Sequence, residues 1–252
     1  EYGEAATRHV RYEYASLMSM CDHYLGKVLD MMDKYDLWKD TMLIVNTDHG
    51  FMLGEKEWMG KNVQPMYEEL IHIPFFIYDP RNPIQGERRN QLAQTIDIVP
   101  TLAEFFQIAP PEYMDGHSLT PVIRNDTPIR NYALFGIFGG HICITDGRYV
   151  YMRSCKDPEN RPFSREEMSE AELCDKNAFN FMKESGVFKV PVHRSTDSYR
   201  FGTMLFDLLT DPEQKCPIHD SNIEDHLCQA MKKMMKDNQA PKEQFERIGL
   251  AE

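Results

Sequence analysis

A short apolar segment that ends in Asp-His-Gly places the tightest limit on how this chain can fold. Residues 41–47 read Thr-Met-Leu-Ile-Val-Asn-Thr, an almost continuous apolar run with β-branched residues. A run of this length is typical of a buried strand, and such strands are common in parallel sheets. It stops abruptly at Asp48-His49-Gly50. Because ligands of open α/β sheets bind at the carboxyl ends of strands, the pattern predicts a functional edge after residue 47.

The segments around this strand alternate between helical and strand patterns. Apolar residues at spacings of three and four predict a helix over 8–36. A second buried strand fits residues 73–78. Another helix fits residues 96–108, with Asp97 as a candidate N-cap. This alternation predicts an α/β fold whose sheet is mainly parallel and is flanked by helices.

The pattern changes near residue 125. Asp146-Gly147 lies between two apolar runs and is a strong hairpin signal. The elements expected here are strands 132–145, 148–153 and 203–209 and helices 166–184 and 223–237. We therefore expect residues 1–125 to form part of an α/β domain and residues 126–252 to form a small α+β subdomain with an antiparallel sheet.

Charge and composition exclude two classes of partner. Lys and Arg number 28 and Asp and Glu number 40, which gives a formal net charge of −12. Nonspecific nucleic-acid binding requires a basic surface, so no nucleic-acid partner is expected. No apolar run approaches the roughly 20 residues of a membrane helix, so no membrane-spanning segment is expected. An anionic substrate would need a local cluster of cations or a metal ion.

The six cysteines form no C-x-x-C pair. This spacing favours reduced thiols and hence a cytoplasmic location, which composition does not otherwise determine. The alternatives are disulfides and a redox or zinc-binding module built on the cysteines. Cys216, His219, His226 and Cys228 are a candidate zinc set.

Candidate chemistry gathers between residues 48 and 61. Asp48 and His49 offer an oxygen and a nitrogen ligand to one metal ion. Lys61, thirteen positions after Asp48, returns a cation toward the same edge. The alternative is that Asp48-His49-Gly50 is a strand-ending turn, since Asp and Gly are common in turns.

Residues 47–61, TDHGFMLGEKEWMGK, resemble the carboxyl-half signature of type I sulfatases, in the alkaline phosphatase superfamily. Other segments resemble the same family in the same order: YLGKVL at 24–29, EELIHIPFFIYDP at 68–80, TIDIVPTL at 95–102, DGHSL at 115–119 and LFDL at 205–208. The resemblance covers about residues 8–215 and implies part of an alkaline-phosphatase-like sheet.

The resemblance also implies roles for individual residues. Asp48 and His49 match two ligands of the family's divalent cation, which is usually Ca²⁺, although an imidazole ligand also suits Mn²⁺ or Zn²⁺. Lys61 matches a catalytic lysine that contacts a sulfate oxygen of the substrate. His141, which follows Phe138-Gly139-Gly140, is a candidate substrate contact at the rim of the site. The alternative for His141 is an ordinary exposed histidine on a strand.

One part of the family's machinery has no counterpart in this sequence. The family nucleophile is a formylglycine made from a C/S-x-P-x-R motif, and no such motif occurs here. The chain also begins with Glu1. We therefore expect a carboxyl-terminal fragment, inactive alone, that needs the missing amino-terminal half to hydrolyse a small sulfate ester or a sulfated sugar. The alternatives are a phosphonate monoester or phosphodiester hydrolase on the same scaffold and a noncatalytic metal-binding fragment.

Overall fold

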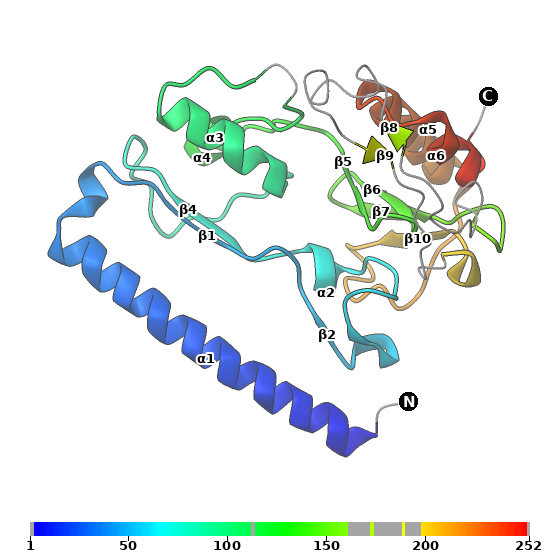
Figure 1. The fold of residues 1–252 in the computed structure, drawn as a ribbon, viewed down its shortest axis with the longest axis horizontal. Coiled ribbons are helices and arrows are strands. Elements are labelled where there is room, and N and C mark those ends of the chain that lie inside the picture. Colours follow the sequence, from blue (N-terminus) through cyan, green and yellow to red (C-terminus); the bar gives the residue numbers. More distant parts are fainter. Residues whose placement is uncertain (1–2, 112–113, 161–171, 174–187, 190–197, 251–252) are drawn as a thin grey trace.

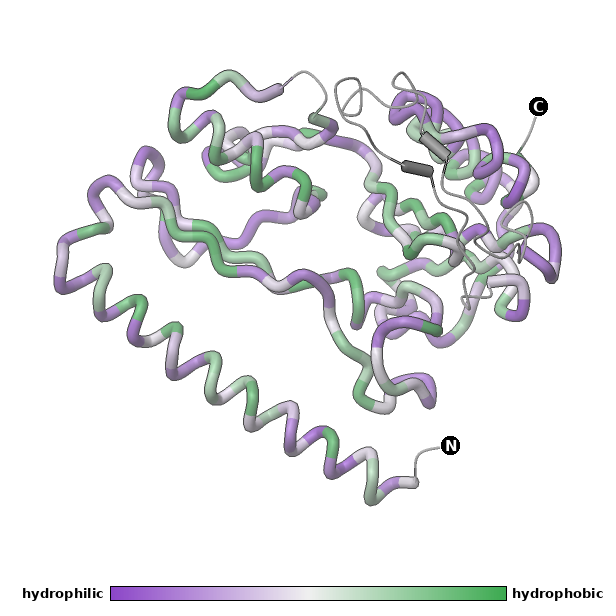
Figure 2. Tube along the Cα trace, in the orientation of Figure 1, coloured by the Kyte–Doolittle hydropathy of each residue, from purple (hydrophilic) through white to green (hydrophobic). Residues whose placement is uncertain are grey.

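The computed structural model describes residues 3–111, 114–160, 172–173, 188–189 and 198–250. Its first element is the 31-residue helix α1 (Glu4–Lys34), which confirms the helix predicted over 8–36. Polar and apolar residues alternate along α1, which runs along one side of the molecule (Figures 1 and 2). Met32 is buried, but Leu17 and Tyr24 are 58% and 57% exposed. The apolar face of α1 is therefore largely open to solvent.

Contacts near the two ends of α1 hold it to the rest of the chain. Arg11 Nε donates to the Leu53 carbonyl at 2.7 Å. After α1, the 3₁₀ turn η1 (Leu37–Lys39) brings Trp38 against Tyr78, with ring centroids 5.0 Å apart. The Tyr78 hydroxyl also donates to the Trp38 carbonyl at 2.8 Å.

The predicted strands 41–47 and 73–78 both form, as β1 (Leu43–Asn46) and β4 (Phe75–Tyr78). They pair antiparallel in the register Leu43↔Tyr78, so the prediction of a parallel arrangement was wrong for this pair. A parallel pair needs a long crossover, usually a helix. The segment between β1 and β4 instead contains a short hairpin and a four-residue helix, which return the chain in the opposite direction.

The ribbon of β1 and β4 is also less buried than the sequence predicted. The β1 residues are intermediate or exposed, and Phe76 of β4 is 68% exposed. An apolar strand normally packs on both faces in an α/β sheet. Within the described ranges, β1 and β4 pair with each other and with no further strand.

The connection between β1 and β4 forms a compact loop region. It consists of strand β2 (Met52–Leu53), the 3₁₀ turn η2 (Glu55–Glu57), strand β3 (Met59–Gly60) and helix α2 (Glu68–Ile71). Strands β2 and β3 pair antiparallel. Met52 and Leu70 are buried in one core cluster, which anchors the hairpin to α2.

The helix predicted over 96–108 begins with a 3₁₀ turn, η3 (Thr95–Asp97), and continues as α3 (Ile98–Phe105). Asp97 is buried and closes a capping box with Gln94, rather than capping α3 with its side chain. It also accepts from His117 N at 2.9 Å and pairs with Arg130. Asp97 thus joins three segments, including the one that leads to helix α4 (Thr120–Asn125).

The later half of the described chain forms a four-stranded antiparallel sheet in the order β10-β7-β6-β5. Its strands are β5 (Ala133–Gly136), β6 (Ile142–Thr145), β7 (Tyr149–Arg153) and β10 (Met204–Asp207). The hairpin predicted at Asp146-Gly147 joins β6 to β7. The single strand predicted over 132–145 is wrong because a turn at 137–141 divides it, with Gly139 at φ +80.

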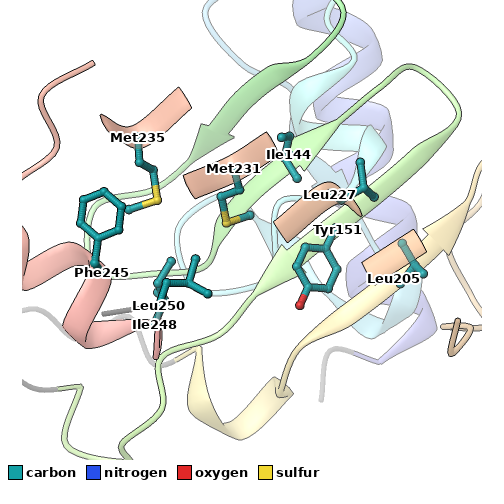
Figure 3. Packing of buried hydrophobic residues seen from close by; sticks show 9 residues of the cluster. All are labelled: Ile144, Tyr151, Leu205, Leu227, Met231, Met235, Phe245, Ile248 and Leu250. Carbon is teal, nitrogen blue, oxygen red and sulfur yellow. The ribbon is translucent and has the colours of Figure 1, made fainter. Parts of the chain in front are cut away.

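Helix α5 (Ser221–Asp237) covers one face of this sheet and confirms the helix predicted over 223–237. Figure 3 shows Leu227, Met231 and Met235 of α5 packed with Ile144 and Tyr151 of the sheet. The short helix α6 (Lys242–Arg247) completes this core. The fold class is therefore confirmed as α/β followed by an antiparallel α+β part, while the boundary at residue 125 remains a prediction.

Two further predictions concern the helix over 166–184 and the absence of a membrane-spanning segment. The helix predicted over 166–184 lies mostly outside them. Residues 172–173 form strand β8 (Glu172–Leu173) instead, which pairs with β9 (Phe188–Lys189). Among the described helices, none combines the length and apolar character needed to cross a bilayer.

Candidate functional site

The carboxyl end of β1 delivers Asp48 and His49 into a tight turn. Gly50 N donates to the Leu70 carbonyl at 2.8 Å, which fixes the turn to α2. A Cβ atom on Gly50 would lie 1.8 Å from the Glu69 carbonyl oxygen, so a side chain cannot fit here without movement. The close approach of α2 to this glycine thus sets where the two preceding side chains lie.

The hydrogen bonds of His49 determine which ring nitrogen is available to a ligand. Nδ1 lies 2.8 Å from the Gly50 carbonyl, which can only accept, so Nδ1 carries a proton. In the neutral ring Nε2 then presents its lone pair. Metal-binding histidines are commonly oriented in this way by a backbone carbonyl.

Lys61 reaches the same point from the hairpin. It follows Gly60, the last residue of β3, and its Nζ lies 2.5 Å from His49 Nε2. Gln64 Nε2 donates to the Gly60 carbonyl at 2.6 Å and so ties down the turn that carries Lys61. The structure therefore brings Asp48, His49 and Lys61 together, as the sequence predicted.

Lys61 differs from its neighbour Lys56 in its partners. Lys56 Nζ lies 2.5 Å from Glu69 Oε1 and sits over the ring of Tyr67. In the part of the chain that the structure describes, Lys61 makes no ion pair with a carboxylate. Its charge is thus available to an anion, whereas that of Lys56 is neutralised by Glu69.

Asp48 and His49 fit part of a metal site. Asp48 Oδ2 lies 3.1 Å from His49 Nε2, and the Asp48 side chain is 79% exposed. The pKa of Asp48 is lowered: desolvation opposes the shift, but the backbone N–H of His49 and electrostatic interaction with its side chain, with a smaller contribution from Lys61, outweigh it. A carboxylate oxygen and an imidazole nitrogen at this separation suit one shared divalent cation.

These two ligands do not make a complete site. Structural and catalytic metals normally have at least three protein ligands, or several oxygens in the case of calcium. Within the described residues, no group of three or more His, Cys, Asp or Glu side chains converges in a way that would hold a metal. The role of Asp48 and His49 as metal ligands therefore remains a prediction.

His141 is buried and lies outside the strands. It precedes β6, is 4% exposed, and its Nε2 donates to the Gly202 carbonyl at 2.9 Å. The alternative of an exposed strand histidine is therefore wrong. A small cavity is lined by His141 and by residues 63–66, which follow Lys61. The ring of His141 thus lies beside the loop that follows β3, residues 61–66, called here the Lys61 loop. The role of His141 as a substrate contact remains a prediction.

The proposed zinc set does not converge. His226 Nε2 is 2.7 Å from the Tyr132 hydroxyl, and the His219 side chain is 89% exposed. Cys228 Sγ lies 3.9 Å from Arg153 Nη1, and Cys216 is exposed. These separate partners contradict a shared metal among the four residues.

Sequence reasoning missed three residues near the Lys61 loop. Trp58 and Phe201 have ring centroids 5.8 Å apart, and the Arg200 guanidinium lies over both rings. The first of these residues lies on the β2–β3 hairpin and the other two on the turn η5 (Tyr199–Phe201). No spacing rule links residues so far apart in the chain, so the sequence held no signal for this cluster.

Comparison with known proteins shows which family this chain resembles. The sulfatase family model matches residues 1–108, which include Asp48, His49 and Lys61. An arylsulfatase of Clostridium perfringens is 31% identical over 148 residues, which cover 56% of this chain and 30% of the relative. Residues 1–108 of this chain thus match the sulfatase family. This confirms the resemblance to type I sulfatases in the alkaline phosphatase superfamily.

Solved structures share the fold of this chain. A protein in complex with its substrate D-glucosamine-2-N,6-O-disulfate aligns with a TM-score of 0.63 and 19% identity, over 88% of this chain and 39% of its own. A phosphonate monoester hydrolase from Silicibacter pomeroyi aligns with a TM-score of 0.63 and 18% identity, over 94% of this chain and 42% of its own.

The chain spans between 20% and 34% of the length of the curated relatives that it matches. The relatives therefore contain large regions that have no counterpart among these 252 residues.

Proposed function

We propose that the full-length protein hydrolyses sulfate esters and that this chain supplies one side of the active site. The observation that carries the proposal is the convergence of Asp48, His49 and Lys61 within the segment that matches the sulfatase family. Asp48 and His49 would hold a divalent cation, for which Ca²⁺ is the first expectation and Mn²⁺ or Zn²⁺ are alternatives. When bound, such a cation would stabilise negative charge on the transferring group.

In this proposal Lys61 contacts a nonbridging oxygen of the sulfate group. An ammonium on a flexible stem suits one such oxygen as a point charge. In the structure, the lysine ammonium already lies beside His49 Nε2. A metal ion on His49 Nε2 would take the place of the ammonium, and Lys61 would turn toward the neighbouring anion, so that both charges would face the group on which negative charge develops during ester cleavage.

The nucleophile would come from outside these residues. The chain has no C/S-x-P-x-R motif, so a formylglycine would belong to another part of the protein. The exposed apolar residues of α1 and Phe76 of β4 offer a surface for that part to cover. We therefore include the amino-terminal half of the same protein as the partner of α1 and the β1–β4 ribbon.

The substrate proposal rests on the relatives. One relative is an N-acetylglucosamine-6-O-sulfatase of Bacteroides thetaiotaomicron, 29% identical over 45% of this chain, and a fold neighbour is bound to a disulfated sugar. A sulfated sugar or a small sulfate ester is thus the proposed substrate class. A phosphonate monoester or phosphodiester is the second candidate, because a phosphonate monoester hydrolase shares the fold.

The test compares an aryl sulfate, an aryl phosphonate monoester and an aryl phosphodiester as substrates of the purified full-length protein. We expect the sulfate ester to have the highest kcat/KM and chelation to abolish its turnover. Metal analysis should show loss of bound metal in Asp48→Ala and retention in Asp225→Ala, an exposed carboxylate elsewhere. Faster turnover of the phosphonate or the phosphodiester would favour the second candidate, and no turnover of any ester would contradict a hydrolase.

A further inference from the structure

Arg200 lies over two aromatic rings beside the loop that carries Lys61. Its guanidinium carbon is 4.5 Å from the ring centroid of Phe201 and 5.5 Å from that of Trp58. The two rings meet edge to face, with their planes at 62°. Guanidinium stacked on aromatic faces is a favourable arrangement that keeps the side chain in one orientation.

The segment that carries Arg200 is fixed at both ends. Ser198 is buried, and its hydroxyl accepts from Cys155 N at 3.0 Å. The Gly202 carbonyl accepts from His141 Nε2 at 2.9 Å. Phe201 also lines the cavity formed with residues 63–66, which continue directly from Lys61. Arg200 is therefore presented by an anchored turn against the Lys61 loop.

Within the described part of the chain, the charge of Arg200 has no carboxylate partner. There its guanidinium makes no ion pair and donates no hydrogen bond, and the residue is exposed. By contrast, Arg81 and Arg148, which also lie over aromatic rings, pair with Asp79 and Asp207. The contacts with the two rings use none of the guanidinium N–H groups as donors to a protein acceptor, so these groups are available for a planar or tetrahedral anion.

The position of Trp58 relates this cation to Lys61. Trp58 is three residues before Lys61, so their Cα atoms are at most about 11 Å apart. Arg200, on η5, and Lys61, on the loop after β3, are thus two cations without carboxylate partners, within the described residues, on neighbouring segments of a protein whose net charge is −12. Two such charges on neighbouring segments favour a ligand that carries more than one negative group.

We propose that Arg200, held by Trp58 and Phe201, binds a second anionic group of the substrate, such as a carboxylate or a further sulfate on the same saccharide. This inference rests on the proposed sulfatase function and narrows its substrate class to polyanionic saccharides. Lys61 would contact the sulfate that is cleaved, and Arg200 the group that is retained. Arg200 is thus a specificity residue rather than a catalytic one.

The test uses the full-length protein and two substrates. One is an aryl sulfate with a single negative charge, and the other is a sulfated disaccharide that also carries a carboxylate. Arg200→Gln should lower kcat/KM for the disaccharide by roughly 10- to 100-fold, the usual effect of losing a hydrogen bond to a charged group. The same variant should leave kcat/KM for the aryl sulfate within about twofold of the wild-type value.

Matched variants separate charge from geometry. Arg88→Gln removes the same charge from an exposed loop position and should not change kcat/KM for either substrate. Arg200→Lys keeps the charge but loses the planar edge, so it should restore part of the activity on the disaccharide. An equal loss on both substrates, or no loss on either, would overturn the proposal.

A binding measurement keeps this test separate from the proposed function. Calorimetric titration of the disaccharide into wild type and Arg200→Gln reports the second anion site even in the absence of turnover. We expect weaker binding in the variant, with the difference decreasing as salt rises. Equal affinity would overturn the role of Arg200. A protein that binds the disaccharide through Arg200 but cleaves no sulfate ester would contradict the proposed function alone.

Discussion

Gly50 shows how one residue without a side chain positions two functional ones. The backbone of α2 approaches this glycine so closely that a Cβ would overlap the Glu69 carbonyl oxygen. Gly50→Ala should therefore destabilise the protein by about 2 kcal/mol, as overpacked sites do. It should also weaken metal binding, because the turn that carries His49 must move.

The matched control for this prediction is Gly26→Ala. Gly26 lies within α1, and a Cβ there would meet no atom within 4 Å. Alanine in a helix interior is favoured over glycine by roughly 0.5–1 kcal/mol, so this variant should be at least as stable as wild type. Urea denaturation of both variants measures the contrast. Equal stability of Gly50→Ala and wild type would show that α2 yields easily.

Lys61→Ala tests the proposed sulfate contact. In the full-length protein it should lower kcat/KM by on the order of 10²-fold, equivalent to about 2.7 kcal/mol, as does removal of one electrostatic donor to a transition state. Lys61→Arg should restore kcat/KM only in part, because the planar guanidinium places its N–H groups differently from a compact ammonium. Lys242→Ala, whose side chain is 84% exposed, is the control and should have no effect. A change within a factor of about two for Lys61→Ala would remove this lysine from the site.

Some site residues were predictable from sequence and others were not. Asp48 and His49 follow an apolar strand directly, so the rule that ligands bind at strand ends identified them. The side chain of Arg200 owes its position to Trp58, which lies 142 positions earlier in the chain. Likewise, the buried His141 donates to a backbone carbonyl at Gly202, in a distant segment of the chain. Contacts between such distant segments leave no local pattern.

At the scale of elements, a buried carboxylate joins the end of β4 to α3. Asp79 accepts from Arg81 Nε and Nη2 at 3.0 and 2.8 Å, and the Arg81 guanidinium stacks on Phe105 of α3. The pKa of Asp79 is lowered: desolvation opposes the shift, but the hydrogen bonds and charge of Arg81 outweigh it. The charged form of Asp79 therefore stabilises the fold.

Asp79→Asn should lower the free energy of unfolding by about 2 kcal/mol at pH 7, the usual size of a charged hydrogen bond. Because the folded pKa lies below the unfolded one, the contribution of Asp79 is present above about pH 4 and is lost as pH falls below that value. Urea denaturation from pH 7 to pH 3 should show wild type and variant converging on acidification. Asp225→Asn, at an exposed position, should match wild type throughout. A difference independent of pH would point to lost packing instead.

Periodicity predicted the helices more reliably than the pairing of the strands. The spacing of apolar residues gave α1 and α5 to within a few residues. The direction of β4 depends on how residues 47–74 fold, and their hairpin and four-residue helix have little periodic signal. The turn at Phe138-Gly139-Gly140 was likewise hidden within an apolar stretch that read as one strand. Short elements are determined by tertiary contacts, which a single sequence pattern does not contain.

At the scale of the whole molecule, this chain should lack sulfatase activity by itself. It has no nucleophile motif, and it offers two converging metal ligands among the described residues. Because calcium usually takes 6–8 oxygen ligands, most of its coordination sphere would be left to water. Calorimetry on the 252-residue chain should show weak calcium binding, and aryl sulfate turnover should be undetectable. Sub-micromolar calcium affinity, or metal-dependent turnover by the pure chain, would contradict the expectation.

The place of β10 in its sheet has a consequence for the order of folding. Strands β5, β6 and β7 form a meander with short connections, whereas about 50 residues separate β7 from β10, its partner at the edge. Closing a long loop costs entropy before any stabilising contact forms between its ends. The meander should therefore form first, and β10 should dock late. Trimming buried Leu205 in β10 should then accelerate unfolding and leave the refolding rate nearly unchanged. Trimming buried Ile144 in β6 should slow refolding, so the two arms of a chevron plot would report which strand the transition state already contains.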